Sequence, residues 1–455
     1  MRIAVTGISG FIGSHLAQAL LEQTNHEVVG LSRSGYQSQN PRLQVKTCDL
    51  YSLLEIEEAL KNCDVAIYLV HSMSPSSRLA QGNFQDFDFI LADNFAKAAL
   101  ACGVQKIIYV SGIIPENDPL SDHLKSRLEV EETFRKSKIP LLTLRCGLVV
   151  GPNGSSFRIL DRLVSRLPLM VLPSWTQNEL QITALEDLTK ILILSVAENA
   201  PFGSFDVGSP EKLTYETLIE KVARLKGLPF RSVHFPWIPL ALSKLWISVV
   251  TETSRQLVYP LVESLRHSMV VQKPLPKTLV IPFASVDEAL RKSLTKGMIS
   301  LPMTRLPKES EKSKVQSVQR LPSPRGWNME KIANEYMRWL PLFMKPFIQV
   351  QKEDFQITMK LRGLPKALLI LKLSEERTFE TRRLFYIVGG LLARNSKKAR
   401  LEFRESPDHT FFIAAIHDFE PRLPWYIYKF TQAPLHAWVM RQFGKHLRGI
   451  EFERN

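Results

Sequence analysis

A glycine-rich segment next to the N-terminus most constrains how this chain can fold. The residues Thr6-Gly7-Ile8-Ser9-Gly10-Phe11-Ile12-Gly13 follow the apolar run RIAVT, which predicts a strand, and precede an expected helix. In such a strand-turn-helix the first glycine permits a tight turn, the second lets backbone amides approach a pyrophosphate, and the third lets the helix pack closely on the sheet. The positive helix end then points at the phosphates, although the same turn can also exist without a ligand. We expect a dinucleotide-binding loop with contacts from Thr6, Gly7, Ser9, Gly10, Phe11, Ile12 and Gly13.

The first 150 residues alternate short β-rich runs with longer amphipathic runs. Strands are expected in RIAVTG, EVVGLS, LQVKT, DVAIYLV, KIIYVSG and PLLTLRCGLVV, and the longer helices at 86–102 and 123–136. This alternation is typical of a doubly wound α/β Rossmann fold, a parallel sheet with helices on both faces. From about residue 151 to 300 apolar helical segments take over, so we expect a helical lobe that completes a first domain over 1–301.

The end of the second expected strand indicates which dinucleotide is bound. NAD sites place an Asp or Glu there to accept hydrogen bonds from the adenosine ribose. This chain has Leu31-Ser32-Arg33-Ser34, and no carboxylate occurs between Glu27 and Asp49. An arginine pairs with a 2′-phosphate, so the sequence favours NADP(H) over NAD(H); a solvated surface charge is the alternative for Arg33. Asp49 can also cap the helix that begins near Ser52. Further cofactor contacts are expected from Ser32, Arg33, Asp49, Leu50, Val70, His71 and Ser72.

Length, composition and charge exclude several classes of protein. A chain of 455 residues exceeds the usual size of a single core, and 45% apolar with 23% charged residues argues against a disordered or integral-membrane chain. The net charge of +14 is concentrated in residues 301–455, which hold 28 Lys+Arg against 16 Asp+Glu. No dense Lys/Arg block or nucleic-acid motif accompanies it. We therefore expect a solvated basic face, or else contact with lipid headgroups, and no nucleic-acid partner.

The cysteines and the N-terminus favour a cytoplasmic protein. Cys48, Cys63, Cys102 and Cys146 form no CxxC pair and have no metal-ligand spacing, so we expect reduced thiols and no metal site. The chain opens directly into a strand, without a signal-peptide pattern. The apolar run 235–250 is short and interrupted by prolines, which predicts a buried or interfacial helix rather than a membrane span. Peripheral association with the inner face of the membrane is the alternative location.

A second domain is expected to begin near residue 327. Residues 302–326 combine four prolines with dense charge and almost no periodicity, which predicts a linker. Beyond it, the runs FIQVQ, FQITMKL, ALLILKL, RRLFYIVGG, ARLEFRE and TFFIAAIHDFE suit antiparallel strands, and a C-terminal helix is expected from Pro434. We expect a curved sheet around that helix. The aromatic residues near its start are expected in the core, or alternatively in the wall of a ligand cavity: Trp425, Tyr426, Tyr428, Phe430 and Trp438.

The ordered motifs resemble the atypical, extended short-chain dehydrogenase/reductase superfamily. They are TGISGFIG at the N-terminus, YLVHSM after the fourth strand, YVSG after the fifth and LRCGLVVGPNGSSF after the sixth. The NmrA-like group, which includes the NAD(P)H-binding accessory subunit of respiratory complex I, looks closest, and the resemblance covers roughly residues 1–300. Residues 327–455 look similar to the DUF2867-type domains fused to this group, which implies an α+β helix-grip fold of the SRPBCC/START type.

The resemblance also implies catalytic positions. Typical members carry Tyr-x-x-x-Lys on the helix after the fifth strand, where the lysine lowers the pKa of the tyrosine and holds the nicotinamide ribose. This chain has His123 and Arg127 at those positions, on one helix face, and Ser111 where the family's catalytic serine would be. A histidine titrates at about pH 6.5 and can donate the proton that a carbonyl oxygen gains on hydride addition. Arg127 can hold ribose hydroxyls. The expected catalytic residues are Ser111, His123 and Arg127.

Three functions follow from these features. The first is an NADP(H)-dependent oxidoreductase that acts on a hydrophobic carbonyl or quinone. The second is a non-catalytic NAD(P)H-binding sensor or scaffold, in which His123 and Arg127 bind cofactor or pair with Glu131 and Glu132. The third is a lipid or quinone carrier. No protein partner is indicated, and this fold hosts all such functions, so whether the chain is an enzyme depends on the geometry of the site.

Overall fold

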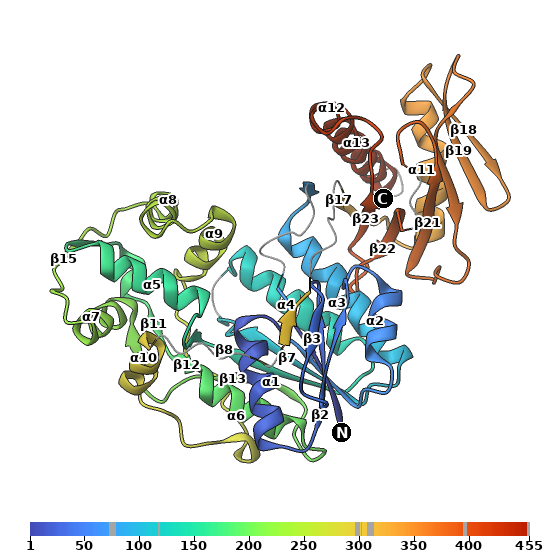
Figure 1. The fold of residues 1–455 in the computed structure, drawn as a ribbon. Helices are drawn as coiled ribbons and strands as arrows, with labels where there is room; N and C mark the ends of the chain where they lie inside the picture. The colour runs from blue at the N-terminus through green and yellow to red at the C-terminus, as the bar shows by residue number, and fades with distance from the viewer. Residues whose placement is uncertain are drawn as a thin grey trace. The chain divides into compact units, whose positions relative to one another are not determined.

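The computed structural model describes residues 1–71, 79–116, 119–295, 301, 303–306, 314–394 and 398–452 (Figure 1). The chain divides into two compact units. The first comprises residues 1–74 and 88–308, and the second comprises residues 75–87 and 309–455. The second unit therefore includes a short segment from the N-terminal part of the chain, which the sequence did not predict.

The first unit is built on a seven-stranded sheet in which every pair of neighbours is parallel. In spatial order the strands are β13 (Gly203–Val207), β8 (Leu141–Cys146), β7 (Lys106–Gly112), β5 (Val65–Tyr68), β1 (Arg2–Thr6), β2 (Glu27–Ser32) and β4 (Leu43–Thr47). The order reverses direction between β1 and β5, as in dinucleotide-binding sheets. The predicted Rossmann-type sheet is thus confirmed, with β13 as a strand that was not predicted.

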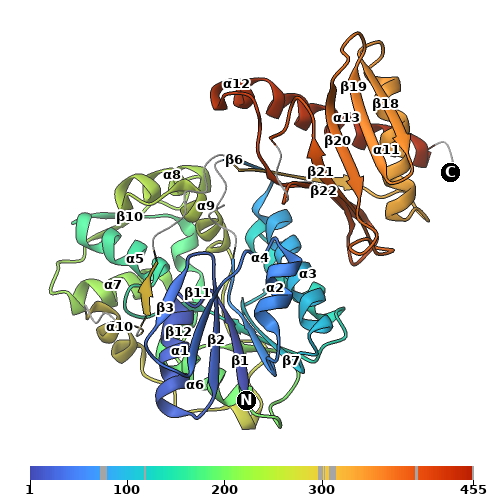
Figure 2. The ribbon, with the colours of Figure 1, turned by 45° about the vertical axis from the view of Figure 1, so that its right-hand side comes forward.

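Helices cover both faces of this sheet, because its strands are apolar on both sides (Figure 2). The helices α1 and α6 pack together, and α4 packs on β7 and β8. Ser121 caps α4 by accepting a hydrogen bond from the Leu124 amide, which fixes where that helix begins. The helices are α1 (Phe11–Gln23), α2 (Leu53–Leu60), α3 (Phe84–Ala101), α4 (Asp122–Arg135) and α6 (Leu185–Val196).

A lobe of helices follows the strands β7 and β8 in the chain, and it also contains short strand pairs. Its core is a separate apolar cluster that includes Phe157, Tyr215 and Ile247. The helices are α5 (Ser155–Arg166), α7 (Tyr215–Leu225), α8 (Leu240–Thr251), α9 (Arg255–Ser264) and α10 (Val286–Leu294), with the 3-10 turn η1 (Ser174–Gln177). A second 3-10 turn, η2 (Lys277–Leu279), packs on α6 and the core of the parallel sheet instead. The pairs are β9 (Leu148–Val150) with β12 (Ile182–Ala184), β10 (Met170–Leu172) with β15 (Ser232–His234), and β11 (Glu179–Leu180) with β14 (Leu213–Thr214).

The second unit contains an antiparallel sheet against which two helices pack. Its spatial order is β18 (Ile348–Glu353), β19 (Gln356–Leu361), β20 (Ala367–Leu373), β21 (Arg382–Gly389), β22 (Arg400–Glu405), β23 (Phe411–Phe419), β17 (Val315–Pro322) and β6 (Leu79–Gln81), the last pair being parallel. Both α11 (Met329–Phe343) and α13 (Gln432–Phe452) contribute to the core, and the short α12 (Trp425–Phe430) precedes α13. The antiparallel strands agree with the prediction, whereas α11 and Tyr428 of α12 share the core with the predicted C-terminal helix. The helix-grip assignment stays a prediction.

Part of the predicted linker 302–326 is instead ordered sheet. Residues 303–305 form β16 (Met303–Arg305), which pairs with β3 (Tyr36–Ser38), and β17 lies between β23 and β6. Val315, Val318 and Leu321 of β17 are buried. These apolar residues are three positions apart rather than two, and prolines and charges surround them, so the segment lacks the period of a strand.

Two further expectations concern the cysteines and the membrane. All four cysteines are free, and burial raises the pKa of the Cys63 thiol to about 11. Within the described ranges, no helix combines the length and apolar character that crossing a bilayer requires. The apolar run 235–250 contributes mainly to α8.

Candidate functional site

The glycine loop has the tight geometry that its sequence predicts. Gly7 adopts a φ of 67°, a conformation that favours glycine, and its carbonyl accepts a hydrogen bond from the Gly10 amide at 2.8 Å. A Cβ on Gly13 would lie 2.2 Å from the Gly7 carbonyl oxygen, so only glycine lets α1 begin this close to β1. The loop therefore forms a backbone cradle at the start of α1, of a shape that fits a pyrophosphate.

Thr6 has a different role from the one predicted for its side chain. It is completely buried, and its hydroxyl accepts a hydrogen bond from the Leu69 amide at 2.8 Å while lying 3.4 Å from the Ile67 carbonyl. The Thr6 side chain thus joins β1 to the end of β5. It supports the loop from below rather than facing a ligand.

A cleft of about 420 Å³ lies over the glycine loop. Arg158, in the first turns of α5, and Asn153 before it were not among the predicted site residues. Gly154 lies so close to Phe11 that a Cβ there would be 2.9 Å from the Phe11 ring, which explains how α5 reaches the loop. A guanidinium beside a helix N-terminus adds to its attraction for an anion. The cleft is lined by Ser9, Gly10, Phe11, Ser14, His15, Asn153, Ser155 and Arg158.

The end of β2 gathers polar groups where a 2′-phosphate is expected. Ser32 is buried and its hydroxyl accepts a hydrogen bond from the Ser34 amide at 3.2 Å, while Arg33 is exposed. Arg305, on β16, donates a hydrogen bond to the Ser34 hydroxyl at 3.2 Å. The sequence alone did not indicate that a second arginine, 272 positions after Arg33, comes to the same turn.

The remaining predicted cofactor residues differ in whether their side chains lie near the glycine loop or in the core. Asp49 accepts from the Tyr51 amide at 3.1 Å, and Ser52 rather than Asp49 caps α2. Leu50 is buried, so its side chain faces the core. Val70 lies over Gly7, with 3.7 Å between its Cγ2 and a Cβ built there. Ser72 lies outside the described residues.

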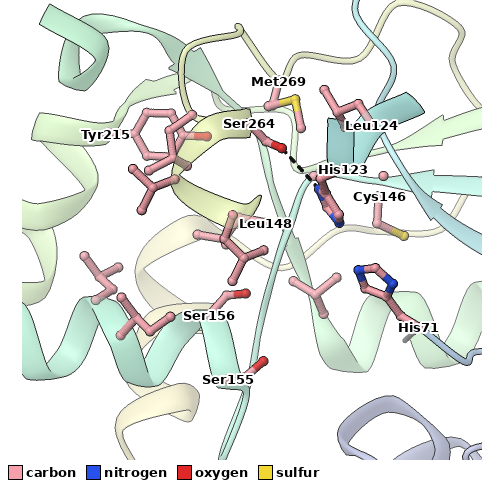
Figure 3. Close-up of a pocket in the computed structure, with 18 of the residues that line it drawn as sticks. His71, His123, Leu124, Cys146, Leu148, Ser155, Ser156, Tyr215, Ser264 and Met269 are labelled. Atoms are coloured by element: carbon pink, nitrogen blue, oxygen red, sulfur yellow. Dashed lines mark hydrogen bonds between the residues drawn. The ribbon is translucent and has the colours of Figure 1, made fainter. Parts of the chain in front are cut away.

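A second cavity, of about 360 Å³, opens at the carboxyl ends of the central strands and extends into the lobe (Figure 3). Its lobe side is almost entirely apolar, with side chains from α5, α7, α8 and α9. Its sheet side carries the polar groups His71, Ser111, His123 and Arg127. The two cavities share the lining residues Phe11 and Ser155, so the apolar pocket lies next to the loop cleft. The apolar lining includes Leu148, Leu160, Leu163, Trp175, Tyr215, Leu218, Ile219, Ile247 and Met269.

Arg127 is held in a buried ion pair with Asp88 of α3, a residue that was not predicted. The same carboxylate accepts a hydrogen bond from Ser126 at 2.8 Å and lies 3.0 Å from His71 Nδ1. Arg127 Nη2 lies 2.6 Å from that His71 nitrogen. The alternative pairing of Arg127 with Glu131 is wrong, because Glu131 pairs with Arg145 at 2.9 Å and with Arg135, which also holds Glu132.

His123 occupies the polar side of the pocket and stays neutral. Its Nδ1 lies 3.1 Å from the Ser264 hydroxyl of α9, and its ring centroid is 5.1 Å from that of His71 (Figure 3). Burial lowers the pKa of His123 well below its usual range, and the neighbouring His71 and Arg127 charges lower it further. Burial, followed by the Arg127 charge, also lowers the pKa of His71. Two neutral imidazoles therefore face the pocket at physiological pH.

The structure brings the three predicted catalytic residues together but gives them unequal roles. Ser111, buried at the end of β7, and His123 both line the pocket, whereas Arg127 is engaged by Asp88. A sequence signal for Asp88 exists, since it is a carboxylate inside the apolar run of α3. Ser264 has no such signal, because it lies 141 positions from His123. No cluster of metal-ligating side chains occurs in the part of the chain that the structure describes.

Comparison with known proteins agrees with this architecture. Residues 3–190 match the NAD dependent epimerase/dehydratase family. The auxiliary protein GraX of Staphylococcus aureus is 25% identical over 140 residues, which are 30% of this chain and 45% of that protein, so the match spans under half of that relative. The ceramide reductase of Caulobacter vibrioides is 25% identical over 238 residues, 51% of this chain and 73% of that protein.

Solved structures show the same fold. The triphenylmethane reductase of Citrobacter sp. aligns with a TM-score of 0.51 at 16% identity, over 65% of this chain and 99% of that one. Its complex with NADP(H) aligns with a TM-score of 0.50 at 15% identity, over 65% of this chain and 100% of that one. The chain thus has the Rossmann-type fold of these enzymes, and residues 3–190 carry the sequence pattern of the NAD dependent epimerase/dehydratase family.

Proposed function

We propose that the chain is an NADP(H)-dependent oxidoreductase that reduces a hydrophobic carbonyl compound or quinone. The observation that carries the proposal is that the two cavities adjoin at Phe11 and Ser155. A dinucleotide held at the glycine loop would place its reactive end beside the apolar pocket, next to His123 and Ser111.

The residues at the loop and at the end of β2 suit a phosphorylated dinucleotide. The start of α1 and Arg158 are positioned for the pyrophosphate. Arg33 and Arg305 flank the Ser34 turn, and a 2′-phosphate there would pair with both guanidinium groups. This pair of cations is the support for NADP(H) over NAD(H). When bound, the nicotinamide supplies or accepts the hydride.

His123 is the group that would exchange a proton with the substrate oxygen. Its Nδ1 lies 3.1 Å from the Ser264 hydroxyl, and the ring lines the same pocket as Ser111. Because its pKa is lowered, His123 is mostly neutral and suited to accept the proton of an alcohol. In the direction of reduction, protonated His123 must donate its proton to the substrate oxygen. The rate of reduction should therefore increase as the pH falls. Ser111 would hydrogen bond the same oxygen.

The size and lining of the pocket support a hydrophobic substrate. A volume of about 360 Å³ with an apolar lobe side suits part of a lipid chain, an aromatic ring system or a quinone. The ceramide reductase of Caulobacter vibrioides, by its name a reductase of a lipid, matches over half of this chain. We therefore favour long-chain or aromatic carbonyl compounds over nucleotide sugars as substrates.

A second candidate is a protein that binds NADP(H) without turnover. It is favoured by the ion pair between Arg127 and Asp88, which keeps the guanidinium from taking the ribose-holding role of the motif lysine. In this case His123 and the pocket would sense a ligand rather than transform it.

Titration of the purified chain with NADPH and NADH by fluorescence tests the cofactor first. Absorbance at the nicotinamide band then follows oxidation of NADPH with long-chain aldehydes, aromatic ketones and quinones. We expect NADPH to bind more tightly and to be oxidised in the presence of at least one class. His123→Gln should lower kcat/KM at least about 100-fold while leaving NADPH binding intact.

The matched control is His234→Gln, because His234 is exposed on β15 and paired with Glu216 at 2.9 Å. This variant should keep full activity. Binding without oxidation across the panel would favour the second candidate. Binding of neither nucleotide would contradict both.

A further inference from the structure

The second unit exposes a group of large apolar side chains around the end of α11, α12 and the start of α13. The Phe343 and Trp438 rings, whose centroids are 5.1 Å apart, join the end of α11 to the first turns of α13. We define this group as the aromatic end. Its members and their exposed fractions are Leu342 66%, Phe347 61%, Tyr426 67%, Phe430 75%, Leu435 49% and Trp438 40%.

These side chains are not required by the core of the unit. The inner face of α13 packs against the sheet through Val439, Phe443 and Leu447, all buried. Leu435 and Trp438 are three positions apart on its outer face. In α12, Tyr428 enters the core while Phe430 remains outside. A cluster of six exposed large apolar residues exceeds the scattered exposure that is normal for a soluble protein, and indicates an interaction surface.

The chain segment that contains α12 and most of α13 carries only positive charges. Residues 421–449 contain five Lys+Arg and no Asp or Glu. Lys345, Lys429 and Arg441 are exposed beside the apolar residues, and Lys429 Nζ lies 5.5 Å from the centre of the Phe430 ring. The carboxylate that contacts α13, Glu335, bonds His446 at 2.7 Å, two turns beyond Trp438.

We propose that the aromatic end docks on an anionic lipid bilayer. Exposed aromatic rings interleaved with Lys and Arg suit the interface of a bilayer, where rings enter the acyl boundary and cations meet phosphate headgroups. The absence of carboxylates from residues 421–449 matches a uniformly anionic surface. This docking goes beyond the proposed oxidoreductase and needs no step of its reaction, and it would bring the chain to the phase in which a hydrophobic substrate dissolves.

Cosedimentation of the full-length protein with vesicles tests the proposal. We expect binding to vesicles of phosphatidylcholine mixed with phosphatidylglycerol, and much weaker binding to phosphatidylcholine alone or at high salt. Lys429→Glu with Arg441→Glu should weaken binding to the anionic vesicles by at least about fivefold for each cation. Phe430→Ser with Trp438→Ser should weaken it about tenfold or more, since the rings no longer enter the interface.

Two pairs of control substitutions match these changes in the first unit. Leu54→Ser with Leu100→Ser removes side chains that are 52% and 53% exposed, and Lys212→Glu with Lys277→Glu makes the same change of charge. Neither pair should alter vesicle binding. Circular dichroism and thermal unfolding of each variant distinguish lost docking from lost folding.

Several results would overturn the proposal. The proposal is wrong if the protein binds neutral and anionic vesicles equally well. It is also wrong if the two double variants of the aromatic end still bind anionic vesicles as tightly as the unchanged protein. Binding that is lost on Leu242→Ser with Val249→Ser, which are exposed on α8 of the first unit, would also overturn the proposal. A stable dimer that becomes a monomer in Phe430→Ser, without vesicle binding by either form, would assign the surface to a second copy of the chain. None of these readouts depends on turnover, so they are independent of the proposed function.

Discussion

Arg127 and Asp88 form a buried ion pair beneath the histidines of the pocket. The Asp88 side chain is 2% exposed and that of Arg127 is 6% exposed, and the same carboxylate lies 3.0 Å from His71 Nδ1. The pair connects α3 to α4 and fixes the orientation of His71. Arg127, at the position of the motif lysine, is thus a positioning residue for the pocket.

Asp88→Asn should destabilise the chain by about 3 to 5 kcal/mol, because it leaves a buried guanidinium without its counter-charge. Urea unfolding monitored by tryptophan fluorescence measures this free energy. Asp93→Asn serves as the control, since the pair of Asp93 with Lys97 on the same helix is partly exposed and should contribute less than about 1 kcal/mol. Equal effects of the two variants would show that the Asp88 pair contributes no more than a surface pair.

Acid should destabilise the chain partly through the two pocket histidines. Their pKa values are lowered by burial from an ordinary value of 6.5. Below that pH the unfolded chain therefore binds more protons than the folded chain, and the free energy of unfolding falls as the pH falls. The stabilisation that the two neutral histidines contribute is fully present above about pH 6.5 and is lost in acid.

His71→Gln with His123→Gln should flatten this dependence, measured as the urea midpoint between neutral and mildly acidic pH. An unchanged slope in the double variant would mean that these histidines titrate alike in the folded and unfolded chain.

Arg33→Ala and Arg305→Ala should each weaken NADPH binding about tenfold, as expected for loss of a charge-assisted hydrogen bond to phosphate. NADH lacks the 2′-phosphate, so its affinity should change little. Calorimetric titration of each variant with both nucleotides gives the ratio of the dissociation constants for NADPH and NADH. Lys277→Ala, an exposed cation in another part of the first unit, is the control. Equal losses for NADPH and NADH would place the two arginines elsewhere on the cofactor.

Gly13→Ala should abolish nucleotide binding and destabilise the chain by about 1 to 3 kcal/mol, because the new Cβ would lie 2.2 Å from the Gly7 carbonyl oxygen. Gly449→Ala is the matched control: nothing lies within 4 Å of a Cβ there, and alanine favours the interior of α13. Binding and thermal unfolding together measure both effects. Intact NADPH binding in Gly13→Ala would contradict the role of the loop.

Much of the fold could be predicted from the sequence because most strands can be recognised from the residues within them. The buried strands read as short apolar runs, and in TGISGFIG only glycine fits at Gly13 because α1 starts this close to β1. Six strands of the first sheet and six of the second were recognised in this way. β17 was not, because its buried apolar residues are three apart and lie among polar residues, charges and prolines.

The residues of the candidate site could likewise be predicted only in part. Gly7, Gly10, Gly13 and Arg33 were found from their positions around the first two strands, whereas Ser111 and His123 were indicated by the family resemblance. The tertiary structure determined which side chains meet at the site. Asp88 forms an ion pair with Arg127, Ser264 lies within hydrogen-bond distance of His123, and Arg305 donates a hydrogen bond to Ser34. A sequence encodes the backbone preferences of each segment locally, whereas partners far apart in the chain, and the pKa values that their burial creates, exist only once the chain has folded.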